Sequence, residues 1–263
     1  MLTNRILFLT KTVISLALIQ LLSSCGSQKE VDKIGDAQQC LNESTQSTAM
    51  NCVSKVDGLT SAGAYNIRCA AAFVREGFAN PTKYTSAFES LKGNTDTSAF
   101  LGLITFSSAG SIATDTENAN TAFNDCYNAS AKGKTLIAAF GYLSTSLLNY
   151  FASFSNSASC NAPSASGYNL TSCITAASTA NLAEVVKIVS LTEPETSAAG
   201  QVQTSIGTVI ISTYTISCTG KGANQDLCNK LLTSINSGGG TTNPRGVAAT
   251  YVKSFLPTIP TGI

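Results

Sequence analysis

The residues with the clearest potential for chemistry are nine cysteines. Thiols form disulfides, bind metals or exchange electrons, and their spacing helps to choose among these reactions. The sequence contains no Cys-x-x-Cys pair and no histidine that would complete a metal cluster. We therefore expect structural disulfides and no bound metal or cofactor, with a metal site or a redox pair as the alternatives. The cysteines are Cys25, Cys40, Cys52, Cys69, Cys126, Cys160, Cys173, Cys218 and Cys228.

The eight cysteines after Cys25 allow many pairings, and their spacing favours particular ones. Three sequence-adjacent pairs each bracket a short polar or glycine-containing segment, as expected where a disulfide joins two helices near their shared turn. The remaining two cysteines would form a long bridge. The predicted disulfides are Cys40–Cys52, Cys160–Cys173, Cys218–Cys228 and the long bridge Cys69–Cys126.

Residues 1–24 have the organisation of an export signal. Arg5 and Lys11 precede the apolar run 12–22, which is too short to span a bilayer comfortably as a permanent helix. The run ends in Leu22-Ser23-Ser24-Cys25, and this ending resembles the lipobox of bacterial lipoproteins. The resemblance covers residues 1–25 only. An ordinary secretory peptide and an uncleaved anchor are the alternative interpretations.

The lipobox resemblance implies cleavage before Cys25, a diacylglycerol on its sulfur and usually an acyl chain on its new amino group. Two or three acyl chains hold a protein stably on a membrane. In lipoproteins of the enteric type an Asp after the cysteine retains the protein on the inner membrane, so Gly26 implies passage to the outer membrane. Lipidation of Cys25 also leaves an even number of cysteines in an oxidising compartment.

The elements that position the cysteines are predicted to be helices, because Ala, Leu, Ser and Asn dominate segments with helical spacing. The fold class is therefore an all-α, disulfide-stapled bundle of about ten helices. The β-branched run Val209–Ile216 leaves a strand as an alternative. Expected helices cover 30–43, 47–57, 61–78, 80–93, 96–108, 112–131 and 136–154, one that begins at Thr192, and a short one from Asn243.

Four parts of the chain are expected: a signal peptide (1–24), a lipidated tether (25–30), a helical domain (31–236) and a C-terminal part (237–263). The last part combines a flexible Gly-rich linker, a short helix and a Pro-containing tail. The stretch Ala71–Phe88 is similar to one tetratricopeptide-type hairpin, with different spacing and no second copy. An ordinary helical hairpin is the alternative there.

The segment Leu136–Phe154 carries large apolar residues at spacings of three and four, which make one continuous stripe. Its opposite side holds small or uncharged polar residues, and no charged residue occurs from Thr135 to Ala183. Central packing in a bundle and insertion in a membrane both explain this pattern. Frequent Ser, Thr, Asn and Gly and the lack of basic flanks favour the bundle.

The composition excludes several classes of function. Only 12% of the residues are charged, against about 25% in an average domain, and the formal net charge is +1, which argues against nucleic-acid binding. The absence of histidine removes the usual general base, and the chain has no Gly-x-Ser-x-Gly or Ser-x-x-Lys motif. A paired-carboxylate mechanism stays open, because Glu193 and Glu195, or Asp115 and Glu117, could meet other acids in space.

Four tyrosines in the charge-free region could line a ligand groove or pack in the core, and core packing is the commoner use of such residues. These are Tyr142, Tyr150, Tyr168 and Tyr214. We expect a non-catalytic, membrane-anchored module that binds or supports the cell envelope, with an envelope protein or cell-wall component as partner. The alternatives are a small-molecule or lipid carrier with a cavity among the uncharged helices, and a carboxylate-dependent envelope hydrolase.

Overall fold

The computed structural model describes residues 28–80, 82, 85, 89, 97–161, 168–219, 225–254 and 256. These residues form helices and contain no β-strand, which confirms the predicted all-α, disulfide-stapled bundle. Cys25 and the expected signal segment lie outside the described residues, as does most of the helix expected at 80–93. Within the described ranges, no helix is both long enough and apolar enough to cross a membrane.

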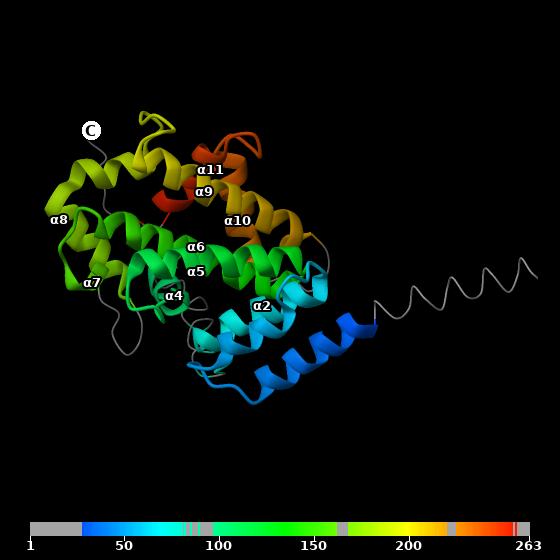
Figure 1. Ribbon diagram of the computed structural model, residues 1–263. Coiled ribbons are helices and arrows are strands. Elements are labelled where there is room, and N and C mark those ends of the chain that lie inside the picture. The colour runs from blue at the N-terminus through cyan, green and yellow to red at the C-terminus, as the bar shows by residue number, and fades with distance from the viewer. Residues whose placement is uncertain are drawn as a thin grey trace, which may run out of the picture.

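The N-terminal layer consists of a helix over residues 28–42, the 3-10 helix η1 (Ala49–Val56) and α2 (Ala62–Arg75). These elements run along the lower edge of the molecule in Figure 1. The Ser61 side chain begins α2 by accepting a hydrogen bond from the Ala64 amide. The layer has a small apolar core of its own, made of Ala37, Leu41, Ala49, Cys52, Val56, Ala64, Ile67 and Ala71.

The main bundle is arranged around α6 (Lys132–Ala152), which lies in the middle of Figure 1. Before it come α4 (Thr97–Ile104) and α5 (Ile112–Asn128). After it come α7 (Ala158–Asn161), α8 (Leu170–Val189), α9 (Ala198–Thr213), the π-helical turn η2 (Tyr214–Cys218), α10 (Gln225–Ser237) and α11 (Pro244–Lys253).

Helix α6 accounts for the first part of the uncharged run, because it is buried on every side from Thr135 to Leu148. Its small face receives the chain after α4: a Cβ at Gly141 would lie 2.8 Å from the Phe106 ring. The Thr145 hydroxyl accepts a hydrogen bond from the Phe106 amide at 3.1 Å. Small and hydroxyl-bearing residues here therefore serve close helix packing and backbone pairing inside the protein.

Four disulfides join the same pairs that the spacing predicts. Cys69–Cys126 links α2 to α5 and so connects the N-terminal layer with the main bundle, across a Cα–Cα distance of 5.0 Å. The other three pairs close short local loops of the chain. They are Cys40–Cys52, Cys160–Cys173 and Cys218–Cys228.

The start predicted for α9 at Thr192 is wrong, because Ser197 caps the helix instead and accepts a hydrogen bond from the Gly200 amide at 3.1 Å. The preceding residues form a turn, in which the Ser197 amide bonds the Pro194 carbonyl at 3.1 Å. Buried Gln203 holds this connection by donating to the carbonyls of Ile188 and Ser190. The strand alternative at 209–216 is also wrong, since this run continues α9 into η2.

The glycine-rich segment expected to be a flexible linker forms a compact turn between α10 and α11. Gly239 and Gly240 have φ angles of 98° and 83°, which favour glycine. The Asn243 side chain donates to the Gly238 carbonyl at 2.9 Å and accepts from the Gly246 amide at 3.1 Å. As a result α11 packs into the main core through residues such as Val247 and Tyr251.

Candidate functional site

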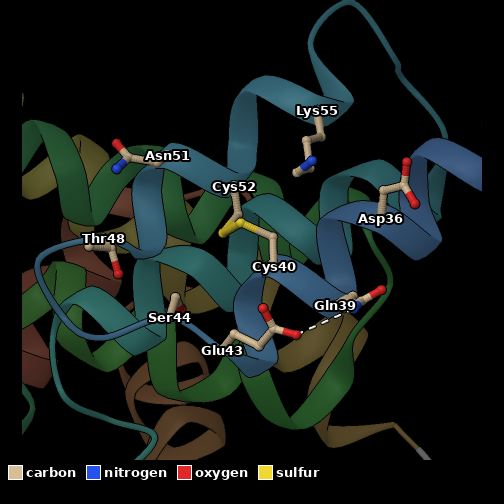
Figure 2. A pocket seen from close by; sticks show the side chains of 9 residues that line it. All are labelled: Asp36, Gln39, Cys40, Glu43, Ser44, Thr48, Asn51, Cys52 and Lys55. Carbon is tan, nitrogen blue, oxygen red and sulfur yellow. Dashed lines mark hydrogen bonds between the residues drawn. A yellow bond between two sulfur atoms is a disulfide. The ribbon is translucent and has the colours of Figure 1, made fainter.

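An open groove of about 620 Å³ lies between helix 28–42 and η1. Figure 2 shows the Cys40–Cys52 disulfide among the side chains that line it. Apart from this disulfide, the lining side chains carry amides, hydroxyls, carboxylates and one amine. They belong to Asp36, Gln39, Glu43, Ser44, Thr48, Asn51 and Lys55.

A tight turn brings the two walls of the groove together. The first helix ends where the Ser44 hydroxyl and amide both donate to the Leu41 carbonyl, at 2.8 Å and 3.1 Å. The Thr45 amide then donates to the Thr48 hydroxyl at 2.9 Å, and η1 begins at Ala49. The chain therefore reverses direction within a few residues, and the disulfide fixes the resulting hairpin.

The antiparallel hairpin places opposite charges at one end of the groove. Asp36 lies one helical turn before Cys40, and Lys55 lies one 3-10 turn after Cys52. Both side chains are exposed, and among the described residues neither belongs to an ion pair. This end of the groove therefore presents a carboxylate and an ammonium group to solvent.

The other end of the groove is acidic and rich in hydrogen-bonding groups. The Gln39 amide donates to the Glu43 carboxylate at 3.3 Å, which orients that carboxylate along the helix. Ser44 and Thr48 lie close by in Figure 2. Exposed charges of this kind contribute little singly, so the groove is suited to a polar partner that makes several contacts at once.

A metal does not account for this lining. Nowhere in the described part of the chain do three or more His, Cys, Asp or Glu side chains gather in a way that would hold a metal ion. Cys40 and Cys52 are bonded to each other and are not free ligands. The side chains that line the groove offer hydrogen-bonding groups and charges.

Of the carboxylates considered from the sequence, Asp115 lies near another acid, Glu76. Asp115 is fully buried, whereas Glu117 is exposed on the same helix. Glu193 and Glu195 both lie in the connection before α9. The sequence did not predict that Glu76, at the end of α2, lies near Asp115, because α4 and its flanking segments separate the two residues in the chain.

The two buried carboxylates hold the segment between α4 and α5. Glu76 accepts hydrogen bonds from the amides of Ser107 and Ser108, at 2.9 Å and 3.2 Å. Asp115 accepts from the Ala109 amide at 2.8 Å. Three consecutive backbone amides thus find carboxylate partners, and this satisfies polar groups that would otherwise be buried at a cost.

Burial raises the pKa of Asp115, an effect that the Ala109 hydrogen bond opposes and the nearby Glu76 carboxylate reinforces. Burial and the adjacent Asp115 carboxylate raise the pKa of Tyr168 to about 12. Asp115 and Glu76 are buried, and their hydrogen bonds to the amides of residues 107–109 support this segment.

The tyrosines of the charge-free region mainly pack in the core. Tyr142, Tyr150 and Tyr168 are buried, and Tyr214 is partly buried on η2. The Tyr150 hydroxyl donates to the Glu184 carbonyl at 2.9 Å, which ties α6 to α8.

The sequence did not predict the groove beside Cys40. Its two polar walls come from separate segments, and only the hairpin brings them together.

Comparisons with known proteins found no relative of this chain. No known protein family, curated protein or solved structure matches the chain.

Proposed function

We propose that this protein is a lipid-anchored, non-catalytic binding module of a bacterial cell envelope, and that the groove beside Cys40–Cys52 is its contact site. The observation that carries the proposal is a disulfide-braced groove whose exposed side chains offer both charges and several hydrogen-bonding groups. Such a surface is rigid at its centre, so little ordering accompanies binding. Its polar lining favours an envelope protein or a cell-wall component as the partner.

The anchor belongs to the same proposal. Leu22-Ser23-Ser24-Cys25 resembles a lipobox, and the eight other cysteines pair with one another in the described structure. An odd cysteine at the end of an export signal, followed by an oxidised body, is what a lipoprotein of an oxidising compartment requires. We assign the protein to the outer membrane on the basis of Gly26.

The lipid is tested by the mass of the N-terminal peptide from protein purified in its native host. We expect a peptide that begins at Cys25 and carries two or three acyl chains. A Cys25→Ser variant should lack them and should leave the membrane fraction. An unmodified Cys25, or an N-terminus elsewhere, would contradict the anchor.

The contact site is tested by a photoreactive amino acid at Asn51, which lines the groove, with the same residue at Thr208 as the matched control. Thr208 is exposed on α9, in a part of the molecule that does not line the groove. In cells with the anchor intact, we expect a crosslinked product from Asn51 and none from Thr208. Replacement of two of the three charged side chains of the groove, Glu43→Gln with Lys55→Met, should reduce that product at least several-fold.

Different results would identify the other candidate functions. Equal crosslinking from both positions would refute the groove as the contact site. Turnover of a cell-wall glycan by the purified protein would indicate a hydrolase, and a lipophilic molecule that copurifies stoichiometrically would indicate a carrier.

A further inference from the structure

We infer that the first turn of helix 28–42 lies directly against the bilayer, so that the body of the protein is held on the membrane without a spacer. This inference rests on the proposed lipidation of Cys25. Of the residues expected as a tether, 25–30, those from Gln28 onward are helical. The surface that meets the membrane is therefore the N-terminal end of this helix.

Chain length limits the separation. Cys25 and Gln28 are three residues apart, and an extended chain spans at most about 3.6 Å per residue, or roughly 11 Å in total. Val31 lies three helical residues further, which adds about 4.5 Å. The polar headgroup region of one leaflet is itself about 5–8 Å thick. A lipidated Cys25 thus leaves little chain outside the headgroups before the helix starts.

The exposure pattern of the helix agrees with this placement. Ile34 packs against the small core of the N-terminal layer, with its side chain 2.8 Å from where a Cβ of Gly63 would be, and the first fully buried residue of the helix is Ala37. Val31 is 60% exposed, although it is a large apolar side chain. The first turn is therefore mostly exposed, and it carries an exposed apolar residue at the end of the helix nearest the proposed anchor.

Charge does not hold this end on anionic lipid. Lys29 and Lys33 alternate with Glu30, Asp32 and Asp36 over the first turns of the helix. A balanced segment gains little from a negatively charged surface, in contrast to a basic cluster. The acyl chains provide the attachment, and the chain length provides the orientation.

The orientation also restricts the partner of the groove. Asp36 and Glu43 lie about 12 Å and 22 Å along the helix axis from Gln28. The groove is then held near the membrane, while the connection between α8 and α9 lies on the other side of α6 in Figure 1. The partner should be a protein that is itself at the membrane surface.

Energy transfer tests this orientation cleanly, because the chain has no tryptophan. Val31→Trp and Leu191→Trp each introduce a single donor at an exposed large apolar residue, the second of which is 53% exposed in the α8–α9 connection. The lipidated proteins are inserted into phosphatidylcholine vesicles with a dansyl-labelled headgroup lipid. We expect at least several-fold more transfer in the Val31→Trp variant than in the Leu191→Trp variant, and no change with added salt.

A spacer variant provides the control. A flexible Gly/Ser segment of about twenty residues between Ser27 and Gln28 adds a mean reach of roughly 25 Å. Transfer from the Val31→Trp donor should then fall toward that of the Leu191→Trp donor. Equal transfer from the two donors in the protein without the spacer, or no effect of the spacer, would overturn the inference.

The lipid is verified separately in the same samples by the mass of the N-terminal peptide. A missing acyl group would overturn the proposed anchor and this inference with it. Acylated protein with equal transfer from both donors would overturn only the orientation.

Discussion

The Nε atom of Arg68 in α2 donates to the Oδ1 atom of Asp125 in α5 at 3.3 Å, next to the Cys69–Cys126 disulfide. The same guanidinium donates to the carbonyls of Val56 and Leu59, at 3.3 Å and 2.9 Å. One side chain therefore joins η1, the loop after it and the main bundle. Arg68 and Cys69 are adjacent, and they link the N-terminal layer to the main bundle by an ion pair and a disulfide respectively.

Arg68→Met should destabilise the protein by about 2–4 kcal/mol, because it leaves Asp125 and two carbonyls without their donor. Both partners of the ion pair are largely buried, with side-chain exposures of 19% and 13%. Urea unfolding followed by far-ultraviolet circular dichroism measures the loss. Lys187→Met, which breaks the more exposed pair with Glu184, should change stability by no more than about 0.5 kcal/mol. Equal effects of the two variants would contradict the role of Arg68.

Asp115 should make the protein less stable as the pH rises. Burial raises its pKa above the ordinary value of 3.8, so the folded state binds this proton more tightly than the unfolded state. The favourable contribution is present below about pH 4 and is lost as the pH rises through the folded-state pKa. Asp115→Asn, which keeps an acceptor for the Ala109 amide, should lose less stability between about pH 4 and 7 than the unsubstituted protein. Urea titrations across that range measure this, and parallel curves would refute it.

The disulfides should be reduced in two groups. Cys40 and Cys218 are partly exposed, whereas both sulfurs of Cys69–Cys126 and of Cys160–Cys173 belong to fully buried residues. Thiol–disulfide exchange requires access to a sulfur, so Cys40–Cys52 and Cys218–Cys228 should open first under native conditions. Limited dithiothreitol followed by alkylation and peptide mapping gives the order. Simultaneous loss of all four would show that global unfolding controls the reaction.

Gly207 allows α9 to approach α11. A Cβ there would lie 1.8 Å from the Pro244 carbonyl oxygen, and backbone cannot move aside as a flexible side chain does. Gly207→Ala should therefore cost about 2 kcal/mol or more. Gly133→Ala is the matched control, since that helical glycine has open space around its Cβ position, and it should be neutral or stabilise by up to about 1 kcal/mol. Thermal unfolding compares the two, and similar melting temperatures would contradict the steric argument.

Local patterns in the sequence predicted much of the fold. Helical spacing predicted the stripe of α6, and cysteine spacing predicted the pairs that the structure joins. Ser197 was missed as a cap because Thr192 and Glu195 form a plausible capping box, and tertiary hydrogen bonds from Gln203 override it.

The candidate site was less accessible to sequence reasoning. The groove depends on which residues of helix 28–42 oppose which residues of η1, and neither segment alone indicates that Asp36 lies across from Lys55. Arg68 and Glu76 likewise find their partners far along the chain. Contacts of this kind follow from the packing of whole elements, which composition and periodicity do not specify.

The disulfide pattern has a consequence for how the protein is made. After Cys25, the cysteines pair in the order in which they occur along the chain, first with second, third with fourth and so on. The paired cysteines are separated by 12, 57, 13 and 10 residues. A chain that enters an oxidising compartment from its N-terminus therefore reaches the native set if each thiol simply joins the next one to arrive, and no disulfide isomerase is required. A free thiol at Cys25 would shift this order by one. Acylation of that sulfur, as proposed here, would remove the competitor before the first pair forms.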